Sequence, residues 1–470
     1  MEMHVLAARM RCGETIGARD AAGMVLALSV PSILEQLVTT AMEYIDAAMV
    51  GHLGAGATAA IGVVSSTTWL CGGLLRGVAT GFAVQIAQYL GAQREQDARG
   101  VLRQAILANG IVGAAMSLIA FFVSFRLPAW LGAAPEIRAD ASAYFRIYAL
   151  FLPLTFALIL YSSILRCSGD ARTPSILNAL MCPLDACFNF FLINPARCIT
   201  LFGRSIRIWG AGLGVAGAAL GTAAATALVA AIMAGCLLLR RGPLALRHPG
   251  SWRFTHTCLV NLRRIGLPVA AERAALSTAQ IFLIRIVTGL GTVSVAANSL
   301  AVSAEALCYL PGYGLQAAAL TLVGQAVGAG RRDMARRFAR LCTAAGMTLM
   351  GLSALFMYLF AVPLMSIFTP DARVIALGAK VLRIEAFAEP LFGASIVAAG
   401  AMQGAGDSRA PFWIDLCSMW GLRVLLALAL APRFGLYGVW SAMCLELCVR
   451  GSIFLVRLAR GRWLRRGALD

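Results

Sequence analysis

The chain has 470 residues, of which 60% are hydrophobic and 13% are charged, and its mean hydropathy is +0.78. A soluble domain of this length could not bury so much apolar surface, so the composition excludes a soluble protein and predicts a polytopic membrane protein. The net charge of +18 comes almost entirely from arginine. The arginines fall in short segments between apolar runs, which favours a role in membrane topology over nucleic-acid binding.

Apolar runs separated by charged residues, Gly or Pro predict an all-α protein with twelve transmembrane helices. The predicted spans are 22–50, 58–90, 101–125, 140–165, 174–194, 211–239, 261–288, 294–327, 340–362, 376–402, 411–431 and 436–459. Arginine is concentrated in the loops on one side, so the positive-inside rule predicts that both termini are cytoplasmic. The segment 195–210 departs from this pattern, because it carries three arginines on the predicted outer side.

An internal repeat divides the chain into two halves when it is shifted by 237 residues. The aligned features include Pro31 with Pro268, Glu35 with Glu272, Gly77 with Gly314, Gln88 with Gln325, and CSGDARTP (167–174) with GAGDSRAP (404–411). The repeat predicts two pseudo-symmetric six-helix lobes of parallel topology. The expected segments are a cytoplasmic N-terminal segment (1–21), an N-lobe (22–239), a cytoplasmic linker (240–260), a C-lobe (261–459) and a cytoplasmic tail (460–470). Asp170 and Asp407, at the loop starts, are expected to cap the helices that follow.

The first span carries the carboxylates Glu35, Glu43 and Asp46. A carboxylate at helix-centre depth costs ~2.5–3.5 kcal/mol on insertion scales, so such a residue usually has a function. Asp46 lies among small apolar residues and is predicted to be functional. Glu35 lies about one turn after Pro31, so the alternative for it is a solvated helix end.

The fifth span places three polar residues on one helical face, at spacings of seven and four residues: Asn178, Asp185 and Asn189. They are candidates for ion binding, and the alternative is interhelical hydrogen bonding, which contributes only ~0.6 kcal/mol on average. The two halves differ here, because the second half has Leu283 and Leu422 where the first has Asp46 and Asp185. The acidic residues of the second half are Glu272, Glu305, Glu385, Glu389, Asp415 and Glu446, with Arg273, Arg285, Arg423 and Arg450 as candidate counter-ions.

Several motifs, in order and in both halves, resemble the multidrug and toxic compound extrusion (MATE) family. They are PSILEQL (31–37), YIDAAMVGHLG (44–54), the long run 295–330, GDSRAPFWIDLCSMWGLR (406–423) and GRW (461–463). The resemblance implies a V-shaped pair of six-helix lobes that exports organic, often cationic compounds by antiport with H⁺ or Na⁺. It also implies that Asp46 carries the coupling ion and that the first helix bends at Pro31. The order Asp185 then Asn189 is the reverse of the family's pattern, and Leu276 stands near the position of a C-lobe glutamate in Na⁺-using members.

The leading hypothesis is a proton-coupled exporter in which Asp46 and Asp185 share one proton, with Asn189 and Asn178 nearby. Na⁺ held by Asp46 and Asp185 is the alternative coupling ion, and no other metal or cofactor is expected. Glu305, Glu35 and Glu272 are the second choice for a coupling or substrate carboxylate. Cationic aromatic substrates are expected to contact three residues, Trp69, Tyr309 and Gln316.

The expected setting is a monomer in a bacterial inner membrane, with a small organic molecule and the lipid bilayer as its partners and no nucleic acid. A second hypothesis keeps the fold and changes the cargo to a lipid-linked or other metabolite, as in flippases. A third is an integral membrane transferase. The sequence has no clustered catalytic motif for the third, and its duplication favours a transporter over an enzyme.

Overall fold

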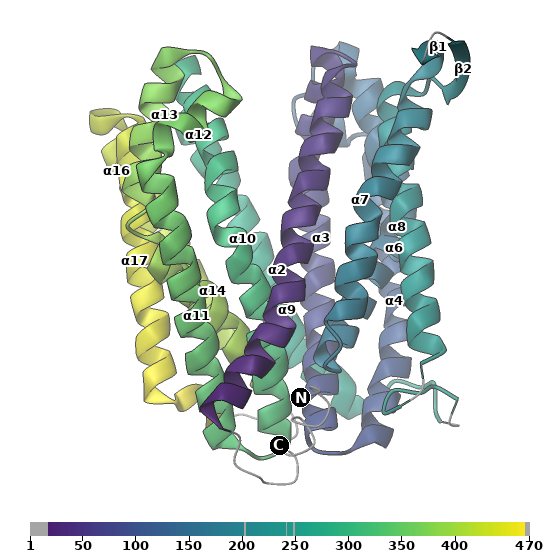
Figure 1. Ribbon diagram of the computed structural model, residues 1–470, viewed down its shortest axis with the longest axis vertical. Coiled ribbons are helices and arrows are strands. Elements are labelled where there is room, and N and C mark those ends of the chain that lie inside the picture. The colour runs from purple at the N-terminus through teal and green to yellow at the C-terminus, as the bar shows by residue number, and fades with distance from the viewer. Residues whose placement is uncertain (1–16, 202–203, 241, 248–249, 466–470) are drawn as a thin grey trace.

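The computed structural model describes residues 17–201, 204–240, 242–247 and 250–465. Its helices form two lobes that diverge towards one end of the molecule (Figure 1). The first helix begins and the last helix ends at the opposite end, where the lobes approach each other (Figure 1). The prediction of an all-α polytopic membrane protein is confirmed, apart from one short β-hairpin.

The N-lobe contains most of the elements that the first half of the sequence predicts. In chain order they are α2 (Ala18–Gly51), α3 (Ala55–Gly91), α4 (Glu95–Ser124), α5 (Leu127–Trp130), η1 (Pro135–Ile137), α6 (Arg138–Cys167), α7 (Arg172–Ile193), β1 (Pro195–Leu201), β2 (Arg204–Ala211) and α8 (Gly214–Leu238). The helices α2 and α3 are joined by a tight turn at Gly54, whose φ of 107° is a conformation that glycine adopts without steric cost. The equivalent turn of the second half uses Gly291, with a φ of 94°.

The C-lobe repeats this order with more interruptions. Its elements are α9 (His256–Thr288), α10 (Thr292–Gly328), α11 (Arg332–Leu359), α12 (Ala361–Phe368), α13 (Ala372–Glu385), α14 (Glu389–Gly404), α15 (Arg409–Ser418), the π-helix η2 (Met419–Val424), α16 (Leu425–Phe434), α17 (Leu436–Arg460) and η3 (Arg462–Arg465). The helix α9 starts inside the segment predicted as a linker, and most helices extend a few residues beyond their predicted ends.

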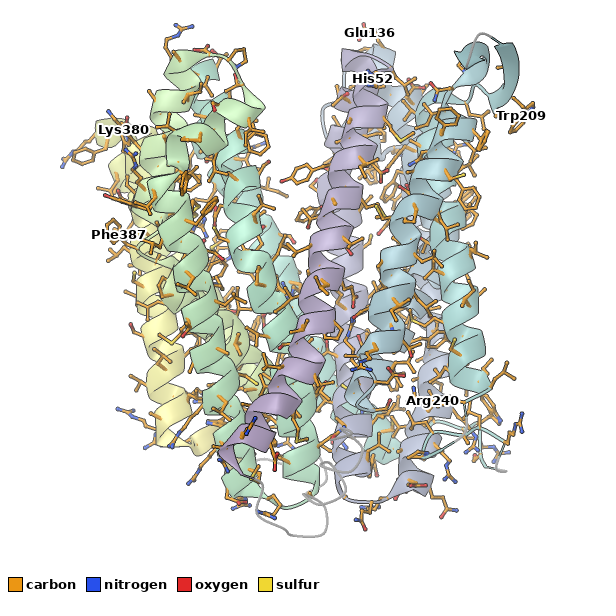
Figure 2. The ribbon with its side chains drawn as sticks, viewed as in Figure 1. His52, Glu136, Trp209, Arg240, Lys380 and Phe387 are labelled. Atoms are coloured by element: carbon orange, nitrogen blue, oxygen red, sulfur yellow. The ribbon has the colours of Figure 1, made fainter. Side chains whose placement is uncertain are left out.

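Among the described residues, eleven helices are long and apolar enough to cross a membrane, where the sequence predicted twelve. The difference is the predicted span 376–402, which the structure divides into α13 and α14. Pro390 lies in the first turn of α14, and a proline there starts a new helix because it lacks the N–H that would continue the old one. Phe387, within the break, is 70% exposed on the outer side of the C-lobe (Figure 2).

The arginine-containing segment 195–210 forms an antiparallel hairpin of β1 and β2. The sequence analysis predicted an outer loop here and missed the strands. The hairpin lies at the end of the molecule away from the termini, and Trp209 projects from it (Figure 2). Arg240, after the last helix of the same lobe, lies at the opposite end (Figure 2).

The first helix of each lobe begins in the core of the other lobe. In α2, the buried residues of the first three turns pack in a cluster with C-lobe side chains such as Leu315 and Phe338. These α2 residues are Ala21, Met24, Val25 and Leu28. In the same way, Cys258 of α9 belongs to the N-lobe cluster that contains Leu102, and Leu262 packs against it. Figure 1 shows α2 slanting across to the C-lobe at its start.

Two symmetry-related glutamines join the lobes where they approach each other. Gln88 of α3 donates to the carbonyl of Gly404 in α14 at 2.9 Å, and Gln325 of α10 donates to the carbonyl of Cys167 in α6 at 2.8 Å. All four residues are buried. The sequence analysis aligned Gln88 with Gln325, and each donates to the carbonyl of a pair that the repeat also aligns. The repeat therefore produces two equivalent hydrogen bonds across the interface, each satisfying a buried carbonyl.

Each of the two loop aspartates of the repeat pairs with an arginine, but only Asp170 caps a helix. Asp170 accepts from the backbone N–H of Thr173 at 3.0 Å, so it caps α7 as expected, and Arg240 donates to it at 2.9 Å. Burial alone would raise the pKa of Asp170, but the hydrogen bonds from Thr173 and the Arg240 guanidinium bring it below its usual value. Asp407 pairs with Arg457 at 2.5 Å, which is an ion pair to the last helix of its lobe rather than the cap that was predicted.

We expect Gly91→Ala to lower the melting temperature of the purified protein in detergent. A Cβ at Gly91 would overlap the carbonyl oxygen of Gln325, so α3 and α10 would have to move apart. Overpacking of this kind typically costs about 1–3 kcal/mol. Thermal unfolding followed by intrinsic fluorescence measures the change.

Gly62→Ala is the matched control, because Gly62 lies in the same helix and a Cβ there would meet no atom within 4 Å. Alanine is favoured over glycine in helices by roughly 0.5–1 kcal/mol, so this variant should unfold at or above the parent temperature. Equal melting temperatures for the two variants would show that the contact between α3 and α10 does not limit stability.

Candidate functional site

A pair of aspartates faces one asparagine in the N-lobe. The amide of Asn189 in α7 donates to Asp46 of α2 at 3.0 Å and lies 3.2 Å from the carboxylate of Asp185, one turn earlier in α7. Asp185 and Asn189 are fully or almost fully buried, at 0% and 1% exposure, while Asp46 is partly exposed. Two carboxylates are thus held by one amide on facing helices.

The helix α8 makes room for this arrangement. A Cβ at Gly221 would overlap the side-chain oxygen of Asn189, so only glycine allows Asn189 to lie against α8 and turn its amide towards α2. Tyr144 of α6 also interacts electrostatically with Asp46 and Asp185. The site therefore depends on four helices of the N-lobe.

No arginine or lysine among the described residues forms an ion pair with Asp46 or Asp185. One oxygen of Asp185 and the side-chain oxygen of Asn189 are buried and have no hydrogen-bond partner. Two carboxylates this close repel each other when both are ionised. The pair can therefore hold one shared proton, or one cation with the free oxygens as ligands.

Glu35 forms a separate cluster, and the alternative of a solvated helix end is wrong. It is 9% exposed, Arg166 of α6 donates to both of its oxygens at 2.8 Å, and Ser175 donates at 3.0 Å. Asn178, which was grouped with Asp46, instead donates to Glu35 at 2.6 Å. It shares the face of Asp185 as predicted, but it lies almost two turns earlier in α7 and so reaches a different part of α2.

The C-lobe has an equivalent cluster around Glu272. The repeat aligns Glu272 with Glu35 and Asp415 with Asn178, and Glu272 interacts with Asp415. Arg450 of α17 contacts Asp415 at 3.7 Å and Glu446 at 3.1 Å. Arg423, in the π-helix η2, lies 3.9 Å from Glu446. The sequence analysis proposed four arginines as counter-ions, and two of them, Arg423 and Arg450, have this role in the structure.

Three glutamates meet at the break between α13 and α14. Glu305 of α10, Glu385 and Glu389 are buried, and each offers an oxygen within 4.8 Å of the others. Neither oxygen of Glu385 or of Glu389 has a hydrogen-bond partner. Such a group can hold a cation or protons. The sequence analysis named the three residues without grouping them. Glu385 and Glu389 are four residues apart and lie beside Pro390, and this spacing is the signal that could have indicated a shared site.

The residues expected to contact substrate lie in different surroundings. Trp69 of α3 is 72% exposed, Gln316 packs against Gly400 within the C-lobe, and the Tyr309 ring packs edge-on against Tyr313 and Phe392. The three were selected by residue type and approximate depth, and neither criterion fixes which way a helix faces. Their role in substrate binding stays a prediction.

Pro31 lies inside a helix that continues past it from Ala18 to Gly51. The N–H that Pro31 lacks would have donated to the carbonyl of Ala27, and the hydroxyl of Ser32 donates to the next carbonyl, that of Leu28, at 3.0 Å. Pro31 follows the part of α2 that packs in the C-lobe core, and Asp46 lies in the part that faces α7.

A family model supports the division into two halves. The MatE model matches residues 31–191 and again residues 268–429. The two matches begin at Pro31 and Pro268, the pair that the internal repeat aligns. Together they include all of the carboxylates described above except Glu446.

Two curated relatives match over nearly their full length. The probable multidrug resistance protein NorM of Thermotoga maritima is 24% identical over 448 residues, which cover 94% of this chain and 93% of that protein. The multidrug resistance protein PmpM of Pseudomonas aeruginosa is 26% identical over 454 residues, covering 94% of this chain and 92% of PmpM.

Solved transporter structures share the fold. VcmN, a MATE transporter of Vibrio cholerae, superposes with a TM-score of 0.85 at 19% identity, covering 96% of this chain and 99% of that one. A MATE family multidrug resistance transporter in an outward-facing conformation gives 0.86 at 20% identity, covering 95% and 97%. At these identities the likeness shows the fold alone. The family match over both halves shows more: the chain belongs to the MatE family of multidrug and toxic compound extrusion transporters.

Proposed function

We propose that this multi-pass membrane protein exports amphipathic organic compounds in exchange for protons, by alternating access of its two lobes. The relatives named above are multidrug resistance proteins, and the family is one of transporters rather than enzymes. A bacterial inner membrane with cytoplasmic termini is the proposed location. The concentration of arginine near the termini supports that orientation. A monomer is the proposed working unit.

The observation that carries the proposal is the aspartate pair without a counter-ion. Glu35, on the same helix, is neutralised by Arg166, whereas Asp46 and Asp185 have only the neutral amide of Asn189 between them. A buried carboxylate pair without a cation has to take up a proton or an ion to lower its electrostatic energy. Partial exposure of Asp46 gives that proton a path in and out.

The helix α2 connects this site to the rest of the molecule. Its first three turns are part of the C-lobe core, and its last turns hold Asp46 against α7. Protonation removes the repulsion between Asp46 and Asp185, which changes how firmly α2 binds to α7. Because α2 bridges the lobes, that change biases their relative position, and this is the coupling that alternating access requires.

A second candidate places coupling at Glu305, Glu385 and Glu389 in the C-lobe, with Na⁺ as the ion. The observation that favours it is the set of carboxylate oxygens that lack hydrogen-bond donors. Export of a lipid-linked compound on the same fold is the alternative for the cargo. Cationic cargo, the class expected from the sequence, stays a prediction: Glu43 is exposed and Asp46 partly exposed, whereas the four C-lobe glutamates Glu272, Glu305, Glu385 and Glu389 are buried.

We expect Asp46→Asn to abolish proton-driven efflux, with a loss of about tenfold or more, since an amide cannot exchange a proton. The measurement uses everted membrane vesicles with an imposed H⁺ or Na⁺ gradient. Uptake of ethidium, a cationic dye, and of carboxyfluorescein, an acidic one, is followed by fluorescence. The parent should respond to the H⁺ gradient alone.

Asp140→Asn is the control, because Asp140 is an exposed aspartate of the same lobe. It should transport like the parent. Parent-like transport by well-expressed Asp46→Asn would refute coupling at the aspartate pair. Transport driven by Na⁺ and lost in Glu305→Gln would move coupling to the C-lobe glutamates.

Gly221→Ala should weaken proton-driven efflux by about tenfold, because its Cβ would displace Asn189 and remove hydrogen bonds to a carboxylate, which contribute roughly 1.5–3 kcal/mol. Gly235→Ala, in the same helix α8, is the matched control, since a Cβ there meets no atom within 4 Å. Efflux rates at equal expression are compared. Equal rates for the two variants would mean that the position of Asn189 does not matter for coupling.

A further inference from the structure

Two arginines from opposite lobes lie near each other where α3 crosses α9. The crossing is tight: an ideal Cβ at Gly73 of α3 would lie 3.0 Å from the Cβ of Arg273 in α9, and one at Gly77 would lie 2.6 Å from that of Ala270. Arg76 lies between these two glycines in α3. The charges of Arg76 and Arg273 are close enough to repel each other.

Neither arginine forms an ion pair within the described part of the chain. Among the residues that the structure describes, no carboxylate lies within 4.0 Å of Arg76 or Arg273, whereas Arg166, Arg423 and Arg450 all have such a partner. Arg76 is exposed and Arg273 partly exposed, so a solute can reach both.

Other charged groups are near the pair without pairing with it. Glu43 of α2 is exposed and interacts with Arg76 at a longer range. Glu272 and Asp415 interact with Arg273, but both are buried inside the C-lobe, where Arg450 already contacts Asp415. Arg166 and Glu35 also influence Arg76, and they neutralise each other. Of these acidic groups only Glu43 is exposed, so a solute meets two arginines and one glutamate here.

The repeat indicates that the fold does not need these arginines. Arg76 aligns with Tyr313 and Arg273 aligns with Gln36, while their neighbours Gly77 and Glu272 align with identical residues. An arginine within a membrane span costs ~2.5–3.5 kcal/mol on insertion scales, and two that repel each other cost more. Such residues are retained where they bind something.

We propose that Arg76 and Arg273 form a binding site for the acidic group, a carboxylate or a phosphate, of the compound that the protein exports. This inference rests on the proposed export function and specifies the cargo. Guanidinium groups bind carboxylates and phosphates through paired, charge-assisted hydrogen bonds. The Tyr313 ring, 5.9 Å from the Arg273 guanidinium, offers an apolar surface beside the acid. Since each lobe contributes one arginine, an acid bound to both bridges the lobes.

The test measures binding directly, so it does not depend on transport. Fluorescence anisotropy of carboxyfluorescein and of ethidium is recorded with purified protein in a neutral detergent. The parent should bind the acidic dye at least about tenfold more tightly than the cationic one, as expected for charge-assisted pairs. Arg76→Gln and Arg273→Gln should each weaken acid binding about tenfold, and Arg76→Lys should weaken it less because it keeps the charge.

Arg373→Gln is the matched control, because Arg373 is exposed next to Asp371 and far along the chain from both helices. It should bind the acidic dye like the parent, and melting temperatures show whether each variant is folded. Unchanged acid binding in a folded Arg76→Gln, Arg273→Gln double variant would overturn the site. So would ethidium binding as tightly as carboxyfluorescein in the parent.

Competition identifies the source of the acid. Displacement of the dye by naphthoate supports a free organic acid, and displacement by phosphatidylglycerol alone supports a lipid headgroup at the same arginines. Displacement by neither, with binding unaffected by the substitutions, counts against the site. Failure of the proposed export function would be seen in the vesicle experiment and not in the binding experiment. The vesicles would then show no gradient-driven transport of either dye, while the arginine-dependent binding remained.

Discussion

The exchange of first helices between the lobes is the constraint on which the rest of the structure depends. Because α2 begins in the C-lobe core and α9 begins in the N-lobe core, the lobes cannot separate at that end without exposing buried apolar side chains. The buried hydrogen bonds of Gln88 and Gln325 close the same end. At the other end the lobes diverge (Figure 1). Movement of one lobe can therefore be transmitted to the other through α2 and α9.

Residues that recur in both halves hold the helices together, whereas the candidate coupling residues occur in one half only. Gln88 and Gln325 occupy matching places and hold matching helices together. Asp46 has no counterpart in the second half, where Leu283 stands at its position and packs in the apolar core. A feature needed for packing should recur in both halves, so a residue that occurs in only one half is a better candidate for function.

The sequence predicted the number of lobes, the repeat and most helix positions, because apolar length and a fixed offset depend on local order alone. It also placed Asp185 and Asn189 on one face, and the structure turns that face towards Asp46. Helical periodicity predicts which residues share a face but not which side chain on another helix each one contacts. Asn178 was therefore grouped with Asp46, whereas in the structure it donates to Glu35, which is also paired with Arg166. The break after Glu385 was missed because the apolar run 376–402 is long enough for one span, although Pro390 disfavours a helix that continues through it.

The charged residues within the helices fall into two groups, those in ion pairs and those without an ion-pair partner among the described residues. Arginines that face carboxylates, such as Arg166 and Arg450, neutralise buried groups, which leaves an unpaired acidic site within the N-lobe and an unpaired basic one between the lobes. These two sites suit an exchange of a proton for an organic acid. Such an exchange moves two charges in the same electrical direction when the acid is monovalent, because a proton enters as an anion leaves. At about 2.3 kcal/mol per charge for each 100 mV, the membrane potential contributes ~4.6 kcal/mol to each cycle. Exchange of a proton for a monovalent cation is electroneutral and gains nothing from the potential. The sign of the charge between the lobes therefore decides whether the potential drives export.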